Sequence, residues 1–510
     1  MMRHNTLRFL RMILFLIMGA LGIFLVQTLA ELLFTALSPP QLSALTSSEA
    51  RSLVNLLNAK LNQAMAILFI VTGMAVPLTA NLYSLKFLEL FIRNPVIISA
   101  LLFVIFVNLS GLWTSYSSSG EAVPAFHLAL MLVLTIASLL LIFPYLMYVF
   151  RFLHPKTLLG LLEGDVKACL RHARQSRGAA FNRERVAETL EHIANIAVRS
   201  VDRSDRNTAI DSVLSLEKMA RHYWSVRNQL HSSWFEADQN FFLGFSSLAV
   251  SQMTASRSWM EMKLFYQFFE VLRAACPRMP ELTSTIAKSL RKLGLEPASL
   301  ENPALRELVI DYFNTFLRLT INRRDVRSVF IIFDQYRTLA ETMEEKFPKE
   351  VLEVAYYFEY YGMAAREQGL PFVVETVAHD LGALVKKAWQ NESPFRKEML
   401  DRFLNYDRQA KPPLPGVKKA QALLASYFIH SGQEEPVEFI RRSFHELEPE
   451  FIRRLERELL QVTSQKYWEV SERRMNIEFV PEPQRVKLRE FFDAVLGNPG
   501  ARDAIPHRQK

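Results

Sequence analysis

Three uncharged polar residues, Thr72, Thr79 and Asn81, lie within an otherwise apolar stretch of the chain. Polar groups are costly in hydrocarbon and often mark the path of an ion or a solute. One interpretation is a pore that these residues line where several subunits meet. The other is hydrogen bonding between neighbouring helices, an effect of about 0.6 kcal/mol for each bond. We favour the second interpretation, because so few polar residues do not make a continuous path.

A second group of residues is positively charged and follows the last apolar segment of the chain. Next to a membrane surface, each Lys or Arg is attracted to anionic lipid by about 1 kcal/mol. The alternative is a solvated flank that only orients the preceding segment. Nucleic acid is disfavoured as a partner, because no recognised nucleic-acid module is present. The residues that we expect to contact anionic lipid of the cytoplasmic leaflet are Arg151, Lys156, Lys167, Arg171 and Arg174.

Four long segments without charged residues position these two groups. They are residues 12–30, 61–85, 95–120 and 128–150. Each has the ~20 residues that an α-helix needs to cross the hydrocarbon of a bilayer. Because a backbone in lipid must satisfy its own hydrogen bonds, each segment is expected to be helical. The sequence therefore predicts a four-helix transmembrane domain over residues 1–153.

Basic residues are concentrated on one side of these four segments. Seven flank them on that side, whereas only Arg51 and Lys60 lie on the other. Positively charged loops are retained in the cytoplasm, so both termini are predicted to be cytoplasmic. The seven residues are Arg3, Arg8, Arg11, Lys86, Arg93, Arg151 and Lys156.

The rest of the chain has the pattern of successive amphipathic helices. Apolar residues recur at spacings of three or four over residues 185–201, and Asp205 is a candidate N-cap for a helix that contains Thr208. We predict a basic juxtamembrane connector over residues 154–185, a cytoplasmic helical domain over 186–500 and a disordered tail over 501–510. One short stretch, residues 477–480, favours extended backbone. Later helices are expected to begin at Pro303, Pro348, Pro394 and Pro436.

Weak self-similarity runs through the C-terminal half. Three helix–loop–helix units are predicted, with turns at residues 320–325, 366–370 and 430–435. The irregular separation of these turns suits a degenerate α-solenoid, in which stacked helix pairs share a continuous core. A compact, irregular helical domain explains the same pattern. The fold class is all-α in either case.

An aromatic run, YYFEYY, occupies residues 356–361. Aromatic side chains dominate the energetics of many interfaces, so this run is a candidate binding surface. Tyr357 and Tyr361 share one face of a helix, whereas Phe358 points away from them. A helix covered on most sides inside a solenoid has the same composition, and we favour that interpretation.

No pattern for catalysis or metal binding is present in the sequence. The eleven histidines are scattered, only 17 glycines occur, and no phosphate-cradling loop or nucleophile elbow is found. The two cysteines, Cys169 and Cys276, are too far apart for a zinc site and are expected to be small buried fillers. We therefore predict a protein that is not an enzyme and has no cofactor.

Two segments carry a resemblance to a known family. They are residues 77–95 (PLTANLYSLKFLELFIRNP) and residues 192–209 (HIANIAVRSVDRSDRNTA). Together they resemble the bacterial predicted membrane protein family called domain of unknown function 2254, over roughly residues 10–225. That family has four N-terminal spans and a helix leading into an Asn-Asp-x-x-Thr-Ala-like segment.

The match to the second family segment is partial. Asp205, Thr208 and Ala209 agree with the family motif, whereas Ser204 stands where the family usually has Asn and Arg206 where it usually has Pro. These departures, and the long helical part that follows, suggest a divergent branch. The resemblance implies a multi-pass protein of the bacterial inner membrane and says little about mechanism.

Two functions from different classes fit these observations. In the first, the spans anchor an interaction protein whose cytoplasmic helical domain binds or senses a protein partner. In the second, the protein is an oligomeric channel for ions or small solutes, with the second span lining the pore. A homo-oligomer is expected in both, and only the channel requires a closed ring. We favour the first, because most of the chain lies outside the membrane.

Overall fold

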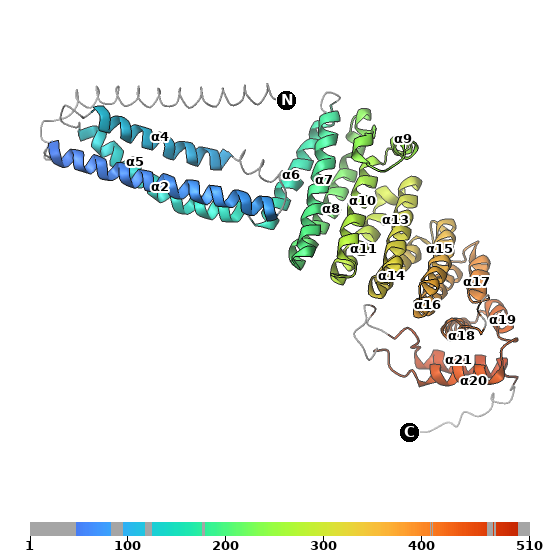
Figure 1. The fold of residues 1–510 in the computed structure, drawn as a ribbon. Coiled ribbons are helices and arrows are strands. Elements are labelled where there is room, and N and C mark those ends of the chain that lie inside the picture. Colours follow the sequence, from blue (N-terminus) through green and yellow to red (C-terminus); the bar gives the residue numbers. More distant parts are fainter. Residues whose placement is uncertain are drawn as a thin grey trace. The chain divides into compact units, whose positions relative to one another are not determined.

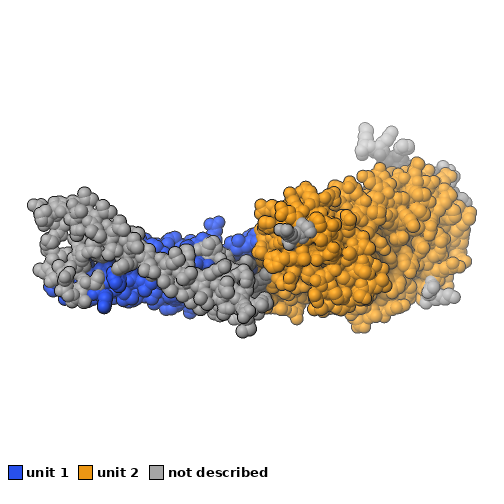
Figure 2. Space-filling view, turned by 90° about the horizontal axis from the view of Figure 1, so that it is seen from above, with its two compact units in different colours: residues 1–161 blue, residues 162–510 orange. Residues whose placement is uncertain are grey.

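All regular secondary structure in the part of the chain that the structure describes is helical. The computed structural model divides into two compact units, Met1–Leu161 and Leu162–Lys510 (Figures 1 and 2). No strand occurs in the described residues, which confirms the all-α prediction for them, and residues 477–480 form a turn and irregular backbone. The described residues are 47–82, 95–117, 125–152, 154–175, 179–408, 410, 412–466, 473 and 476–497.

The first unit contains three long apolar helices that pack against one another. All three are long and apolar enough to cross a membrane. They correspond to the second, third and fourth predicted spans. The first predicted span, residues 12–30, and the predicted tail, residues 501–510, lie outside the described residues. The three helices are α2 (Ser47–Leu82), α4 (Pro95–Ser117) and α5 (Ala125–Phe152).

Apolar side chains both fill and cover this helical unit. Its interior is a cluster that includes Leu61, Val107 and Met131. On the outer surface, Leu140 and Phe143 of α5 are 69% and 72% exposed. Such a large apolar exterior is unsuited to water and suited to contact with lipid tails.

The second unit begins within α6 (Pro155–His172) and continues as a series of helix pairs (Figure 1). The first helix of each pair packs against the first helix of the next, and the second helices do the same, which gives two layers. The predicted connector, residues 154–185, thus includes α6 and the start of α7. The pairs are α7 (Ala179–Asp202) with α8 (Arg206–Val226), α10 (Trp259–Ala275) with α11 (Pro280–Gly294), α13 (Pro303–Asn322) with α14 (Val326–Met343), α15 (Pro348–Glu367) with α16 (Pro371–Gln390), and α17 (Arg396–Asn405) with α18 (Pro415–His430).

Shorter helices complete the second unit. Among them, α21 packs against α18 and is itself contacted by α20. The repeat-like arrangement of the pairs therefore ends in a cap of different construction. These helices are η2 (Arg227–Gln229), η3 (Ser232–Phe235), η4 (Gln239–Phe241), α9 (Ser247–Ala255), α12 (Pro297–Leu300), α19 (Glu434–Arg442), α20 (Pro449–Gln461) and α21 (Glu482–Val495).

The same turn closes three of the helix pairs. A residue with positive φ lies two positions after the end of the first helix: Ser204 (59°), Arg324 (53°) or Gly369 (81°). The next residue donates its N–H to the carbonyl five positions earlier, at 2.8 Å, 3.0 Å and 2.9 Å respectively. These bonds satisfy carbonyls that the end of a helix leaves without a partner. The pairs therefore share a backbone motif although their sequences differ.

Most predicted helix boundaries agree with the structure. The turns at residues 320–325, 366–370 and 430–435 all separate two helices, and Pro303 and Pro348 are first residues of α13 and α15. Two proline predictions are wrong. Pro394 precedes the first residue of α17, and Pro436 is the third residue of α19 rather than its first. At these positions the fixed φ of proline is accommodated in the turn or later in the first helical turn.

Candidate functional site

Three cations project from one side of α6 and its C-terminal extension. Lys167 and Arg171 lie one turn apart on the helix, and Arg174 follows three residues later. Residues three and four apart share a helix face. All three side chains are exposed, so the spacing gathers three positive charges on one surface.

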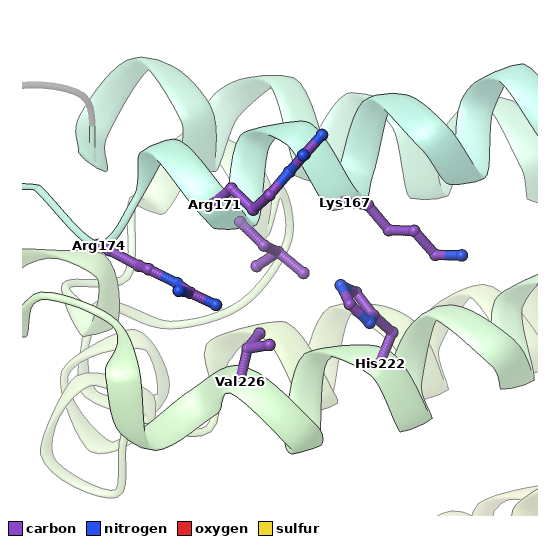
Figure 3. A pocket seen from close by; sticks show the side chains of 6 residues that line it. Lys167, Arg171, Arg174, His222 and Val226 are labelled. Carbon is purple, nitrogen blue, oxygen red and sulfur yellow. The ribbon is translucent and has the colours of Figure 1, made fainter.

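These cations line a hollow of about 370 Å³ between α6 and α8. We call it the basic pocket and define it by Lys167, Arg171, Arg174 and His222. Figure 3 shows the first two on one helix, His222 on the helix opposite, and Arg174 at one end. Two apolar residues complete the lining. They are Leu170, which is buried, and Val226, which is half-buried.

The electrostatic potential of the basic pocket acts on His222. Partial burial, followed by the positive charges of Lys167, Arg171 and Arg174, lowers the pKa of this imidazole below its ordinary value. His222 is therefore neutral near pH 7 and offers one N–H donor and one acceptor nitrogen. Among the described residues, no ion pair involves any of the three cations.

The structure brings together three of the five residues expected to contact anionic lipid. Lys167, Arg171 and Arg174 share the basic pocket, whereas Arg151 and Lys156 belong to the first unit. His222 was not predicted as a member of the site. It is far from the three cations in the sequence, so no local pattern signals the contact.

Two pairs of polar side chains in the apolar unit bond between helices. The Thr72 hydroxyl lies 2.5 Å from Tyr145 Oη on α5 and donates to the Leu68 carbonyl at 2.6 Å. Asn108 Nδ2 of α4 donates to Asn62 Oδ1 of α2 at 2.8 Å. These bonds tie helices of one copy together. Helix α2 continues through the predicted pore residues Thr79 and Asn81, whose side chains lie outside the described residues.

The predicted cap residue lies at the start of α8. Asp205 Oδ1 accepts a hydrogen bond from the Thr208 backbone N–H at 3.1 Å. Asp325 does the same for Ser328 at the start of α14, at 3.2 Å. A carboxylate at this position also interacts favourably with the positive end of the helix dipole. The geometry gives Asp205 a structural role.

A second charged group, which we call the Asp380 cluster, lies in the second unit and consists of Asp380, Arg337 and Arg473. Arg473 donates two hydrogen bonds to the Asp380 carboxylate, at 2.6 Å and 2.7 Å. Arg337 Nε approaches the same carboxylate at 3.2 Å. Burial acts to lower the pKa of Arg473, but the neighbouring Asp380 charge raises it above its ordinary value. The Asp380 side chain is only 2% exposed. Each charge of the cluster is balanced by an opposite charge of the protein itself.

The aromatic run on α15 divides between the core and the surface. Phe358 and Tyr361 are buried, whereas Tyr356 and Tyr360 are 48% and 56% exposed. The guanidinium of Arg402, on α17, lies 5.5 Å from the centre of the Tyr356 ring. We call Tyr356, Tyr360 and Arg402 the aromatic surface. The expectation of core packing therefore describes Phe358 and Tyr361 but not Tyr356 and Tyr360.

The two cysteines are buried and form no disulfide. Cys276 Sγ donates to Asp325 Oδ2 at 2.9 Å, and burial, with the Asp325 carboxylate, raises the pKa of this thiol to about 12. A thiol in this state is a poor nucleophile. Within the part of the chain that the structure describes, no group of His, Cys, Asp and Glu side chains is placed to hold a metal ion.

These features define an all-helical protein with a repeat-like helical unit and, among its described residues, three helices long and apolar enough to cross a membrane. No protein-family model matches the sequence, and no curated protein matches it. One similar solved structure is a circular tandem repeat protein with novel repeat topology and enhanced subunit contact surfaces. It is 14% identical, with 89% of this chain and 97% of that chain covered and a TM-score of 0.32. The resemblance to domain of unknown function 2254 stays a prediction.

Proposed function

We infer that this chain is a multi-pass protein of the bacterial inner membrane whose helical unit binds a protein partner on the cytoplasmic side. The aromatic surface carries this proposal. Tyrosine and arginine are enriched where protein interfaces hold most of their binding energy. Tyr356 and Tyr360 stay exposed although their neighbours in the same helix are buried. The three apolar helices, together with the predicted first span, anchor the protein.

The contacts of Arg402 support the same conclusion. Its guanidinium lies near Glu359 and Glu398, at 3.5 Å and 3.6 Å, as well as over the Tyr356 ring. The arginine is thus held in place before a partner arrives. Ordering a side chain in advance lowers the entropy cost of association. The aromatic surface therefore combines exposed rings with a preorganised cation.

The hydrogen bonds of the apolar unit favour an anchoring role over a pore. Thr72, which the channel interpretation places in a pore, bonds instead to Tyr145 of a neighbouring helix in the same copy. Asn108 and Asn62 bond in the same way. In the channel alternative, Thr79→Val would change the selectivity of the purified protein in planar bilayers. In the anchoring role, the protein gives no conductance.

Site-specific photo-crosslinking in living cells tests the proposal. A photoreactive amino acid replaces Tyr360 in the full-length protein, and a second strain carries it at Phe439, which is 42% exposed on α19. We expect a discrete crosslinked species from position 360 that is absent from position 439. Its mass distinguishes another protein from a second copy of this chain.

A surface substitution serves as the control for specificity. Tyr356→Ala removes a ring of the aromatic surface without disturbing the buried Phe358. The crosslinked species from position 360 is expected to fall about tenfold or more, since hot-spot truncations cost about 2 kcal/mol or more. An undiminished yield of the crosslinked species in the Tyr356→Ala variant would contradict the proposal. Equal crosslinking from positions 360 and 439 would contradict it as well.

A further inference from the structure

The acidic residues of α6 have partners within the protein, whereas the cations of the basic pocket form no ion pair among the described residues. Glu163 accepts a hydrogen bond from Ser215 at 2.7 Å, and Asp165 accepts one from Arg185 Nε at 2.8 Å. Glu163 lies one turn before Lys167 on the same face, but neither it nor any other described acidic residue forms an ion pair with the three cations of the basic pocket.

Gathering three positive charges around a hollow is unfavourable unless an anion enters it. Like charges one helical turn apart destabilise a helix. The negative end of the helix dipole offsets part of this cost for Arg171 and Arg174, because both lie at the C-terminal end of α6. It does not account for His222, which lies on α8 and faces the same hollow.

We propose that the basic pocket binds the phosphate monoester group of an organic ligand. The guanidinium groups of Arg171 and Arg174 can each donate two parallel hydrogen bonds to phosphate oxygens, and the Lys167 ammonium adds a positive charge. The neutral imidazole of His222 adds an N–H donor. A phosphate monoester has two negative charges and several acceptor oxygens, and thus uses all four groups. A carboxylate has one charge and two oxygens, which leaves part of the site without a partner.

The lining of the pocket indicates that the ligand has an apolar part next to the phosphate. Leu170 and Val226 lie among the four polar residues, and the hollow of about 370 Å³ exceeds what a phosphate alone fills. A lipid with a phosphate headgroup and a soluble phosphate ester both have this chemistry. The experiment must therefore distinguish these two sources.

Binding of a dianion is coupled to the protonation of His222. The charged groups that face this imidazole are Lys167, Arg171 and Arg174, which lower its pKa. Lys218, one turn earlier on α8, lies 3.9 Å from Glu163. A bound dianion offsets the three cations and raises the pKa of His222. Anion binding therefore takes up a proton and strengthens as the pH falls.

The first measurement is the binding of radiolabelled inorganic phosphate to the full-length protein in phosphatidylcholine nanodiscs. The native protein is expected to bind phosphate saturably, and the double variant Arg171→Gln/Arg174→Gln to bind at least tenfold more weakly. Both residues are exposed, so the variant is expected to keep its fold. Equal binding by the native protein and this variant would overturn the proposal.

A matched control separates the site from net charge. Lys288→Gln/Lys349→Gln removes the same number of charges from exposed positions on α11 and α15. This control is expected to bind phosphate as the native protein does. An equal loss of binding in the control would show that only overall charge attracts the anion, and the proposal would fail.

Two competitors identify the source of the phosphate. Glycerol 3-phosphate in solution is expected to compete if the ligand is soluble, and phosphatidic acid in the nanodisc if the ligand is a lipid. Competition by each of these two monoesters is compared with competition by phosphatidylserine, whose phosphate is a diester. Competition by either monoester beyond that of phosphatidylserine supports the proposal. If neither monoester competes better than phosphatidylserine, the proposal is wrong.

Sulfate isolates the role of His222, because this dianion keeps its charge across the range in which histidine titrates. Its binding to the native protein should strengthen from about pH 8 to about pH 5.5, on either side of the ordinary histidine pKa. His222→Gln should keep the affinity seen at the higher pH and lose the pH dependence. An unchanged pH dependence in this variant would exclude His222 from the site.

Discussion

The basic pocket and the Asp380 cluster both contain arginines, but only those of the Asp380 cluster are paired with acidic residues in the described part of the chain. In the Asp380 cluster, two arginines share a buried carboxylate, and Arg337 also bonds to Asp334 at 3.0 Å and Glu341 at 2.6 Å. In the basic pocket, the cations surround a hollow. The difference separates charges that stabilise the fold from charges that are available to a ligand.

Burial explains why the two groups differ. A buried charge without a partner costs several kcal/mol, so the Asp380 carboxylate is retained only with its arginines. An exposed cation is solvated and tolerates the absence of a partner. The cations of the basic pocket are exposed. The fold is therefore stable without the ligand, and the site remains open to it.

The largest expected effect is that of Asp380→Ala. It removes the buried carboxylate that two half-buried arginines share, and the free energy of unfolding should fall by about 3–5 kcal/mol. Denaturant unfolding of the full-length protein in detergent, followed by circular dichroism, measures this change. Glu345→Ala, at an exposed position, is the control and should shift stability by no more than about 0.5 kcal/mol. Equal losses in both variants would remove the distinction between the two regions.

A smaller loss is expected from Arg473→Ala. The Asp380 carboxylate then keeps Arg337 at 3.2 Å but loses two hydrogen bonds. Hydrogen bonds to a charged group contribute about 1.5–3 kcal/mol, and we expect a loss in this range. The same unfolding measurement applies. If the free energy of unfolding fell as far as it does in Asp380→Ala, Arg337 would not be stabilising the Asp380 carboxylate.

The smallest effect is expected from Arg171→Gln in the basic pocket. Because Arg171 is exposed and takes part in no ion pair within the described part of the chain, its removal should change the free energy of unfolding by less than about 0.5 kcal/mol. Relief of repulsion from Lys167 acts in the stabilising direction. A loss comparable to that of Arg473→Ala would show that Arg171 supports the fold rather than a ligand.

Local features of the fold were predictable from the sequence. The turns at residues 320–325 and 366–370 are set by residues that act within a few positions, such as the capping Asp325 and the positive-φ Gly369. The apolar segments were recognisable because their composition alone decides which solvent they suit. The error at Pro394 has the same origin, because proline fits a turn as well as the first position of a helix.

The long-range parts of the sites were not predictable. Arg473 and Asp380 are 93 positions apart, and no periodicity connects them. That His222 lines the same hollow as the three cations depends on how α6 and α8 lie relative to each other. For Lys167, Arg171 and Arg174, the sequence predicts the charge and the shared face. The hollow between them requires the packed structure.

The repeated turn has a consequence for the order in which this protein folds during synthesis. Each of the three turns is closed by a bond that spans only five positions, and the pairs contact their neighbours along the chain. Mostly local contacts favour fast folding, and such a stack is able to grow pair by pair as it leaves the ribosome. Asp380 is on α16, whereas Arg473 follows α20 and is synthesised later. The bond between them therefore forms only after α20 has been synthesised. The last part of the helical unit is therefore completed after the earlier pairs have formed.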